Sequence, residues 1–173
     1  AETTSFSAEG GSASGGKNLS HELITSSSQE KARQIAEELL GKATQKQQKI
    51  KEVIQEVERR IAANSLAPSG GSQEIVFEGD KAWKLILAGP VASNIAAKYG
   101  KPTFIFKLGD DISVGSVRSL RENQDSVQTM KSCSDSLISY GGHPKASGFR
   151  IKTENLDKFK HCLIEYFKNH EPR

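Results

Sequence analysis

Residues 74–170 constrain the fold most, because short apolar runs alternate there with turn residues and with helical patterns. Strands that alternate with helices at this density predict an α/β fold, a mixed sheet of about five strands with flanking helices. The predicted strands cover residues 74–78, 83–88, 103–107, 112–117 and 147–151. Predicted helices cover residues 91–99, 125–140 and 153–170. Asp125 and Thr153 are expected to be the N-caps of the second and the third of these helices.

A different pattern comes before this stretch. Apolar residues recur at three- and four-residue steps from about Ser28 to Asn64, which predicts a long helix. Gly41 and the polar residues 44–49 interrupt the apolar pattern. The sequence is therefore equally consistent with a bent helix, with two helices in line and with one straight helix. The Lys/Glu-rich face is most simply solvated surface, and a short coiled-coil seam is the alternative.

The N-terminal residues 1–20 are rich in Ser, Gly and Ala and hold almost no apolar residues. Such a segment buries too little surface to offset the entropy cost of ordering, so we expect it to be flexible. A linker from an expression vector is the competing account of the first dozen residues.

Charge is unevenly spread along the 173 residues, although the net charge is only +3. Residues 81–152 hold eleven Lys and Arg against five Asp and Glu, a local balance of +6. This segment suggests a face that meets a polyanion, and an ordinary solvated surface is the alternative. Aromatic residues make up only 6% of the chain, so backbone contacts to a nucleic acid should dominate over base stacking.

The two cysteines, Cys133 and Cys162, fall in different predicted helices and lack the spacing of metal ligands. We expect them to be small apolar core residues in a reducing cytoplasm. No apolar run reaches membrane-spanning length, and no export signal opens the sequence. A cytoplasmic location with no membrane partner is therefore expected.

A glycine-rich stretch with the sequence SYGGHPKASGF runs from Ser139 to Phe149. We expect a turn here, between the end of a helix near Tyr140 and a strand that begins near Ser147. Glycines let successive amides point into one concavity, which suits a phosphate, and the imidazole of His143 lies beside them. The alternative is that the glycines only cap the helix.

Arg118 comes at the end of a predicted strand, where its planar guanidinium can bind a phosphate in bidentate fashion. The alternative is a surface salt bridge to one of three carboxylates, those of Asp110, Asp111 and Glu122. Ser93 and Asn94 are further candidates. They are expected in the first turn of a helix after Pro90, where free backbone N–H groups can bind an anion.

Three blocks of sequence carry a resemblance: Trp83–Pro102, Val114–Ser119 and Cys133–His143. In this order they resemble the DHH-associated nucleic-acid-binding domain of RecJ-like single-strand exonucleases, over about Gly15 to Ile151. The resemblance implies a flexible segment over residues 1–20, a long connector helix over 21–66 and a substrate-binding α/β domain over 73–173.

The resemblance also implies binding residues. In the family the arginine of the block that matches Gly115, Ser116, Arg118 and Ser119 contacts the nucleic-acid backbone. The family's Gly-Gly-His turn, which faces the substrate cleft, matches Gly141, Gly142 and His143, with Lys145 as a weaker electrostatic helper. Asn94 departs from the family pattern, because an arginine is common there, and one phosphate contact is thereby in doubt.

Family members hydrolyse phosphodiesters with two metal ions, Mn or Mg, held by aspartates and histidines of a separate domain that carries an Asp-His-His triplet. The four histidines of this chain are scattered, and no acidic cluster offers oxygen ligands. We therefore expect no catalytic residue, metal or cofactor in this chain, and no activity from it alone. The expected partners are single-stranded nucleic acid or a short oligonucleotide, and the catalytic DHH domain of a parent exonuclease.

Two alternatives stay open. One is the same domain in an enzyme that acts on short oligoribonucleotides or dinucleotides. The other is a binding or scaffold module without catalysis, which dimerises through the long helix.

Overall fold

A computed structural model describes residues 18–65, 74–120 and 124–170 of the chain. The chain divides into two compact units, one that ends at Lys51 and one that starts at Glu52. Within the described residues, no helix is long and apolar enough to cross a membrane.

The first unit consists of α1 (Leu19–Thr25) and the first part of α2 (Gln29–Ser65). Asn18 caps α1, since its side chain accepts a hydrogen bond of 3.2 Å from the backbone N–H of His21. Helix α2 continues without interruption through Gly41, so the alternative of two helices in line is wrong. Most of the segment expected to be flexible, residues 1–17, lies outside the described residues.

The second unit is built on a five-stranded mixed sheet, and the predicted fold class is confirmed. The strands lie in the order β1-β2-β3-β5-β4; β1 and β2 are parallel, and every other neighbouring pair is antiparallel. The strands are β1 (Val76–Asp80), β2 (Thr103–Lys107), β3 (Ile112–Arg118), β4 (Leu137–His143) and β5 (Ala146–Lys152).

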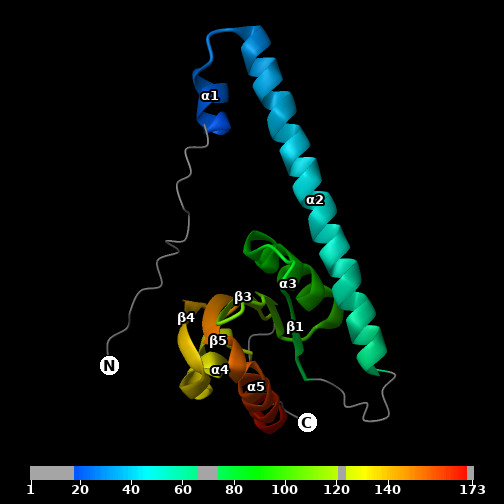
Figure 1. Cartoon of the computed structure of the whole chain (residues 1–173), viewed down its shortest axis with the longest axis vertical. Helices are drawn as coiled ribbons and strands as arrows, with labels where there is room; N and C mark the ends of the chain where they lie inside the picture. The colour runs from blue at the N-terminus through cyan, green and yellow to red at the C-terminus, as the bar shows by residue number, and fades with distance from the viewer. Residues whose placement is uncertain (1–17, 66–73, 121–123, 171–173) are drawn as a thin grey trace. The chain divides into compact units, whose positions relative to one another are not determined.

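Helices cover the two faces of this sheet unequally (Figure 1). Helices α4 (Ser126–Ser132) and α5 (Leu156–His170) pack on one face, and α3 (Leu85–Tyr99) packs on β2 and β3 on the other. The aromatic core lies under α5, where the rings of Phe104 and Phe159 meet edge to face with centroids 6.0 Å apart. We call this the core face of the sheet.

The strand predicted over residues 83–88 is wrong, because Leu85–Tyr99 forms one helix with Pro90 inside it. The first predicted strand instead extends to Asp80, where β1 ends. A short apolar run such as Leu85–Ala88 has no periodicity that separates a strand from a helix. Here the run continues into the alanine-rich residues up to Ala97, and the buried side chains of the whole stretch pack on β2 and β3 as one helix.

The segment that contains Gly141, Gly142 and His143 is also different from the prediction. Helix α4 ends at Ser132, a short 3₁₀ turn follows at Ser134–Ser136, and Leu137–His143 is strand β4. The start of α4 is as predicted, since the Asp125 carboxylate accepts hydrogen bonds from two backbone N–H groups at 2.8 and 3.0 Å. The expected cap at Thr153 is wrong, because its hydroxyl instead donates to the carbonyl of Gly109 at 2.9 Å.

Cys133 and Cys162 form a disulfide that joins the end of α4 to α5. The expectation of two separate apolar cysteines is therefore wrong. Sequence spacing did not reveal the pair, since 29 residues separate the two positions and only the packing of α4 against α5 brings them together.

The C-terminal end of α2 is fixed to β1 by ionic contacts within the second unit. The Arg60 guanidinium donates to the Asp80 carboxylate at 2.6 Å and to Glu56 at 2.7 Å, and it lies 5.1 Å from the centre of the Trp83 ring. A backbone hydrogen bond from Ala82 and the Arg60 contact lower the pKa of Asp80. Arg60 is thus the side chain that connects helix, strand and the following turn.

We predict that Arg60→Ala lowers the free energy of unfolding at pH 7 by about 1–2 kcal/mol, because a charge-assisted hydrogen bond to Asp80 is lost. A depressed carboxylate pKa contributes stability above the unfolded-state pKa and loses it as pH falls through the folded-state pKa. The difference between wild type and variant should therefore shrink below about pH 4. Urea unfolding across pH measures it.

Arg59→Ala is the matched control, since Arg59 binds Glu56 but makes no contact with β1. Its effect on unfolding should be clearly smaller. Equal effects of the two substitutions would show that Arg60 does not connect α2 to the sheet.

Candidate functional site

The face of the sheet opposite the core face is covered only in part. On this face Ile105 of β2 is buried beneath α3, Arg118 of β3 is half-buried, and Arg150 of β5 is exposed. Burial thus falls from β2 towards β5. Helix α3 lies over β2 and part of β3, and it leaves the outer surface of β5 and β4, with the adjoining side of β3, uncovered. We call this surface the open face.

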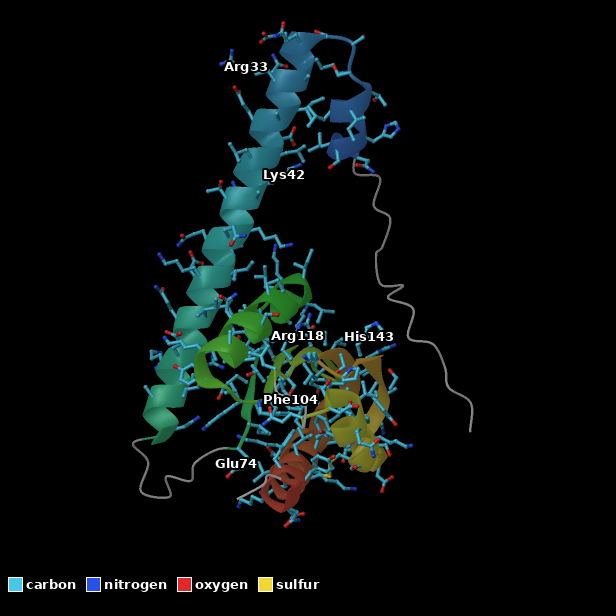
Figure 2. The ribbon with its side chains drawn as sticks, turned by 180° about the vertical axis from the view of Figure 1, so that it is seen from behind. Arg33, Lys42, Glu74, Phe104, Arg118 and His143 are labelled. Atoms are coloured by element: carbon cyan, nitrogen blue, oxygen red, sulfur yellow. A yellow bond between two sulfur atoms is a disulfide. The ribbon has the colours of Figure 1, made fainter. Side chains whose placement is uncertain are left out.

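Register places two predicted binding residues in one row of the open face. Arg118 pairs with Ala146, and Ala146 pairs with His143 on its other side. Directly opposite residues point to the same face of a sheet, so Arg118 and His143 lie about 10 Å apart, two strand spacings, with only a methyl group between them. Figure 2 shows both at the same end of the sheet.

The next row along the strands carries almost no side chains. Ser116 pairs with Gly148, and Gly148 pairs with Gly141. The open face therefore has a floor of bare backbone, where a flat or extended ligand can approach the strands closely. Of the sequence-predicted residues, Ser116, Arg118, Gly141 and His143 meet here.

Helix α3 comes close to Arg118 of the sheet at Gly89. A Cβ atom at Gly89 would lie 3.0 Å from Nη2 of Arg118, so the missing side chain makes room for the guanidinium. The guanidinium also donates to the carbonyl of Val117 at 2.7 Å, which orients it. The glycine in the helix and the strand end together set the position of the charge.

Arg118 is partly desolvated, and none of the described carboxylates neutralises it. Burial lowers the pKa of its guanidinium, and no carboxylate in the described parts of the chain forms a salt bridge with it. Of the three proposed carboxylate partners, Asp110 binds Lys81, Asp111 makes no such contact and Glu122 lies outside the described residues. A half-buried charge of this kind is stabilised by an anionic ligand.

Hydrogen bonds from Ser126 and Ser119 hold the turn next to His143 in place. Ser126 donates its backbone N–H to Pro144 at 2.9 Å, and its hydroxyl lies 2.6 Å from that of Ser147. The backbone N–H of Ser119 donates to the carbonyl of Lys145 at 3.2 Å. These bonds fix the tight hairpin between β4 and β5, and with it the position of the exposed imidazole.

Three other predicted site residues lie inside the sheet or in the turn beside the open face. A Cβ atom at Gly115 would lie 2.5 Å from the Phe149 ring, so Gly115 allows core packing. Ser119 is 1% exposed and its hydroxyl donates to Gln124, which makes it a support of the turn. Lys145 is exposed in the hairpin turn itself, next to His143.

The interpretation of Gly141 and Gly142 as a nest of converging amides is wrong. Both lie on β4, and successive amides of a strand point to opposite edges. Gly142 has a φ of 135°, and a Cβ there would lie 2.6 Å from the carbonyl oxygen of Ala146. Glycine at this position allows the positive φ and the close approach of the two hairpin strands.

Ser93 and Asn94 do not form a helix N-terminal anion site either. Helix α3 begins at Leu85, so both residues lie well inside it. The Ser93 hydroxyl donates to the carbonyl of Gly89 at 3.1 Å and the Asn94 amide donates to that of Pro90 at 3.0 Å. Their backbone N–H groups belong to the interior of the helix, where none is left over for an anion.

Sequence reasoning missed three residues of β5 that face outwards: Ala146, Gly148 and Arg150. A signal was present, since small or basic residues at these positions alternate with Phe149 and Ile151 of the core. Across the described ranges, no group of three His, Cys, Asp or Glu side chains could hold a metal ion.

Comparison with known proteins gives a family match. A family model described as the DHHA1 domain matches residues 72–169. The single-stranded-DNA-specific exonuclease RecJ of Bacillus subtilis is 26% identical over 110 residues, which cover 62% of this chain and 14% of that protein. The putative prophage-derived single-strand DNA-specific exonuclease YorK of the same organism is 33% identical over 145 residues, covering 76% of this chain and 23% of that protein. The chain therefore spans less than a quarter of either relative.

Solved structures show the same fold. RecJ from Thermus thermophilus in complex with Mg²⁺ matches with a TM-score of 0.73 at 22% identity, over 88% of this chain and 23% of that one. An exonuclease RecJ bound to manganese matches with a TM-score of 0.71 at 22% identity, over 88% of this chain and 36% of that one.

We predict that Gly142→Ala destabilises the fold by about 1–3 kcal/mol, because a side chain at positive φ is strained and its Cβ meets the Ala146 carbonyl. Thermal unfolding measures the loss. Gly41→Ala is the control, since nothing lies within 4 Å of a Cβ there and alanine favours a helix. Unchanged stability of the Gly142 variant would contradict the described hairpin.

Proposed function

We propose that this chain, which belongs to the DHHA1 domain family, binds single-stranded nucleic acid on the open face of its sheet. The observation that carries the proposal is the Arg118 guanidinium, half-buried beside a bare backbone floor and without a salt bridge to any carboxylate of the described residues. A phosphate supplies the missing negative charge, and the planar fork of arginine suits it. His143, in the same row of the sheet, donates a second hydrogen bond to the bound nucleic-acid strand.

Contacts of this kind read the backbone and ignore the sequence of bases. Among the described residues of the open face, only Ala146 lies between Arg118 and His143, and the next row holds Ser116, Gly148 and Gly141, so no large side chain there is placed to read a base. We therefore propose sequence-independent binding that weakens steeply as salt rises, because bound phosphates release counter-ions. The names of the Bacillus subtilis relatives favour a single strand as the ligand.

Hydrolysis is proposed for a catalytic DHH domain of a parent exonuclease, with Mn or Mg held there. In this proposal the chain grips the substrate strand, in the cytoplasm, and orients it towards that domain. Arg118 holds a phosphate and the hairpin at His143 limits where the strand can lie. The chain contributes binding and orientation, and proton transfer and metal chemistry belong to the partner domain.

Arg118→Ala should weaken binding of a labelled single strand by about 1–3 kcal/mol while changing the melting temperature little, because a charge-assisted contact to the ligand is lost. His143→Ala should act in the same direction. Fluorescence anisotropy and thermal unfolding on the same samples measure both effects. Lys158→Ala is the control, since Lys158 is exposed on α5, on the core-face side, and its removal changes the net charge equally.

A lowered melting temperature with unchanged affinity would mean that Arg118 and His143 only stabilise the fold. A loss as large in the Lys158 variant would mean that net charge alone determines the affinity.

The isolated chain should show no nuclease activity with either magnesium or manganese, since the chemistry is proposed for another domain. Release of labelled nucleotides from a single strand is the measurement. Metal-dependent cleavage that co-purifies with the chain and is abolished by Arg118→Ala would contradict the division of roles.

A further inference from the structure

We infer that Arg150 binds a second phosphate of the same strand, so that the ligand runs along β5 and must be longer than a dinucleotide to use the whole surface. The inference rests on the proposed function, since it assumes that a first phosphate lies at Arg118. It adds a binding residue and a length preference to the open face.

Register places Arg150 on the same face as the first site. Residues two apart on a strand point the same way, so Ala146, Gly148 and Arg150 all face outwards from β5. Arg150 pairs with Val114 on β3 and with Ser139 on β4, two rows away from the row of Arg118. Arg150 of β5 therefore points to the same face as Arg118 of the neighbouring strand β3.

The described residues of the row between the two arginines carry no bulky side chain. The intervening row on the open face holds Ser116, Gly148 and Gly141. An extended chain can therefore lie along the glycine floor in contact with the backbone. Four residues of a strand span about 13 Å, a distance too large for one phosphate to bridge. Contacts at the two ends must go to different phosphates.

Arg150 is available for a ligand. Its side chain is exposed, and within the described ranges no carboxylate forms a salt bridge with it. Two acidic residues near that end of the sheet have other partners, since Glu154 lies 3.6 Å from Lys152 and Asp110 binds Lys81. The third, Asp111, forms no salt bridge with a described residue, Arg150 included. An unpaired, exposed arginine keeps its full attraction for a phosphate and reinforces the +6 balance of residues 81–152.

The two arginines therefore differ in a testable way. A dinucleotide has one internucleotide phosphate and occupies one site, whereas a strand of about eight or more nucleotides occupies both. Removing Arg118 should weaken binding at every length. Removing Arg150 should weaken only the binding of longer strands.

The experiment compares wild type, Arg118→Ala, Arg150→Ala and the control Lys158→Ala, with oligothymidylates of two and about twelve nucleotides at ~50 mM salt. We expect Arg150→Ala to bind the long strand about ten-fold more weakly than wild type, with the slope of log affinity against log salt reduced by about one. Its affinity for the dinucleotide and its melting temperature should be unchanged. Arg150→Lys should retain most of the salt slope, because the charge remains.

Each outcome separates the two hypotheses. If Arg150→Ala binds the long strand as tightly as Lys158→Ala does, the second phosphate site is wrong while the proposed function stands. An equal loss for dinucleotide and long strand also overturns the second site, since both ligands would then use one position. Failure of wild type to bind the long strand overturns the proposed function itself.

Discussion

The pairing of β5 between β3 and β4 is the constraint on which the site and the core both depend. Along this strand Phe149 and Ile151 point into the core, and the residues between them point to the open face. A shift of one residue in register would exchange the two sets and bury Arg150 against α5. The tight hairpin at Pro144 and the hydroxyl contact between Ser126 and Ser147 fix that register.

The second requirement is an arginine that is partly desolvated before any ligand arrives. Gly89 of α3 lets the helix come close to Arg118, and the carbonyl of Val117 holds the guanidinium. Pre-orientation of this kind lowers the entropy cost of binding, since the side chain loses little further freedom. The core supports it, because the aromatic cluster beneath the sheet anchors the strands that carry the site.

Much of the architecture could be predicted from sequence, where the pattern had one reading. Thr103–Lys107 forms a strand as predicted, and β3 and β5 differ from prediction only at their ends. Arg118 and His143 were found from their motifs, and the structure brings them into one row. The errors occurred where short runs were ambiguous: Leu85–Ala88 can be strand or helix alone, and glycines after a helix can cap it or continue as a strand. Gly115 and Ser119 matched a binding motif, yet their roles in packing depend on tertiary contacts that no local pattern reveals.

The central claim is that a single strand lies on the open face, and amide chemical shifts during titration with an oligothymidylate of about twelve nucleotides test it most directly. The account predicts that the largest changes occur at Ser116, Gly141 and Gly148. Changes of similar size are expected at Arg118 and Arg150, in the rows on either side, and at His143 beside the hairpin turn. Residues of α5, on the core-face side, should change little. Changes concentrated on α5, or spread evenly over the surface, would contradict it.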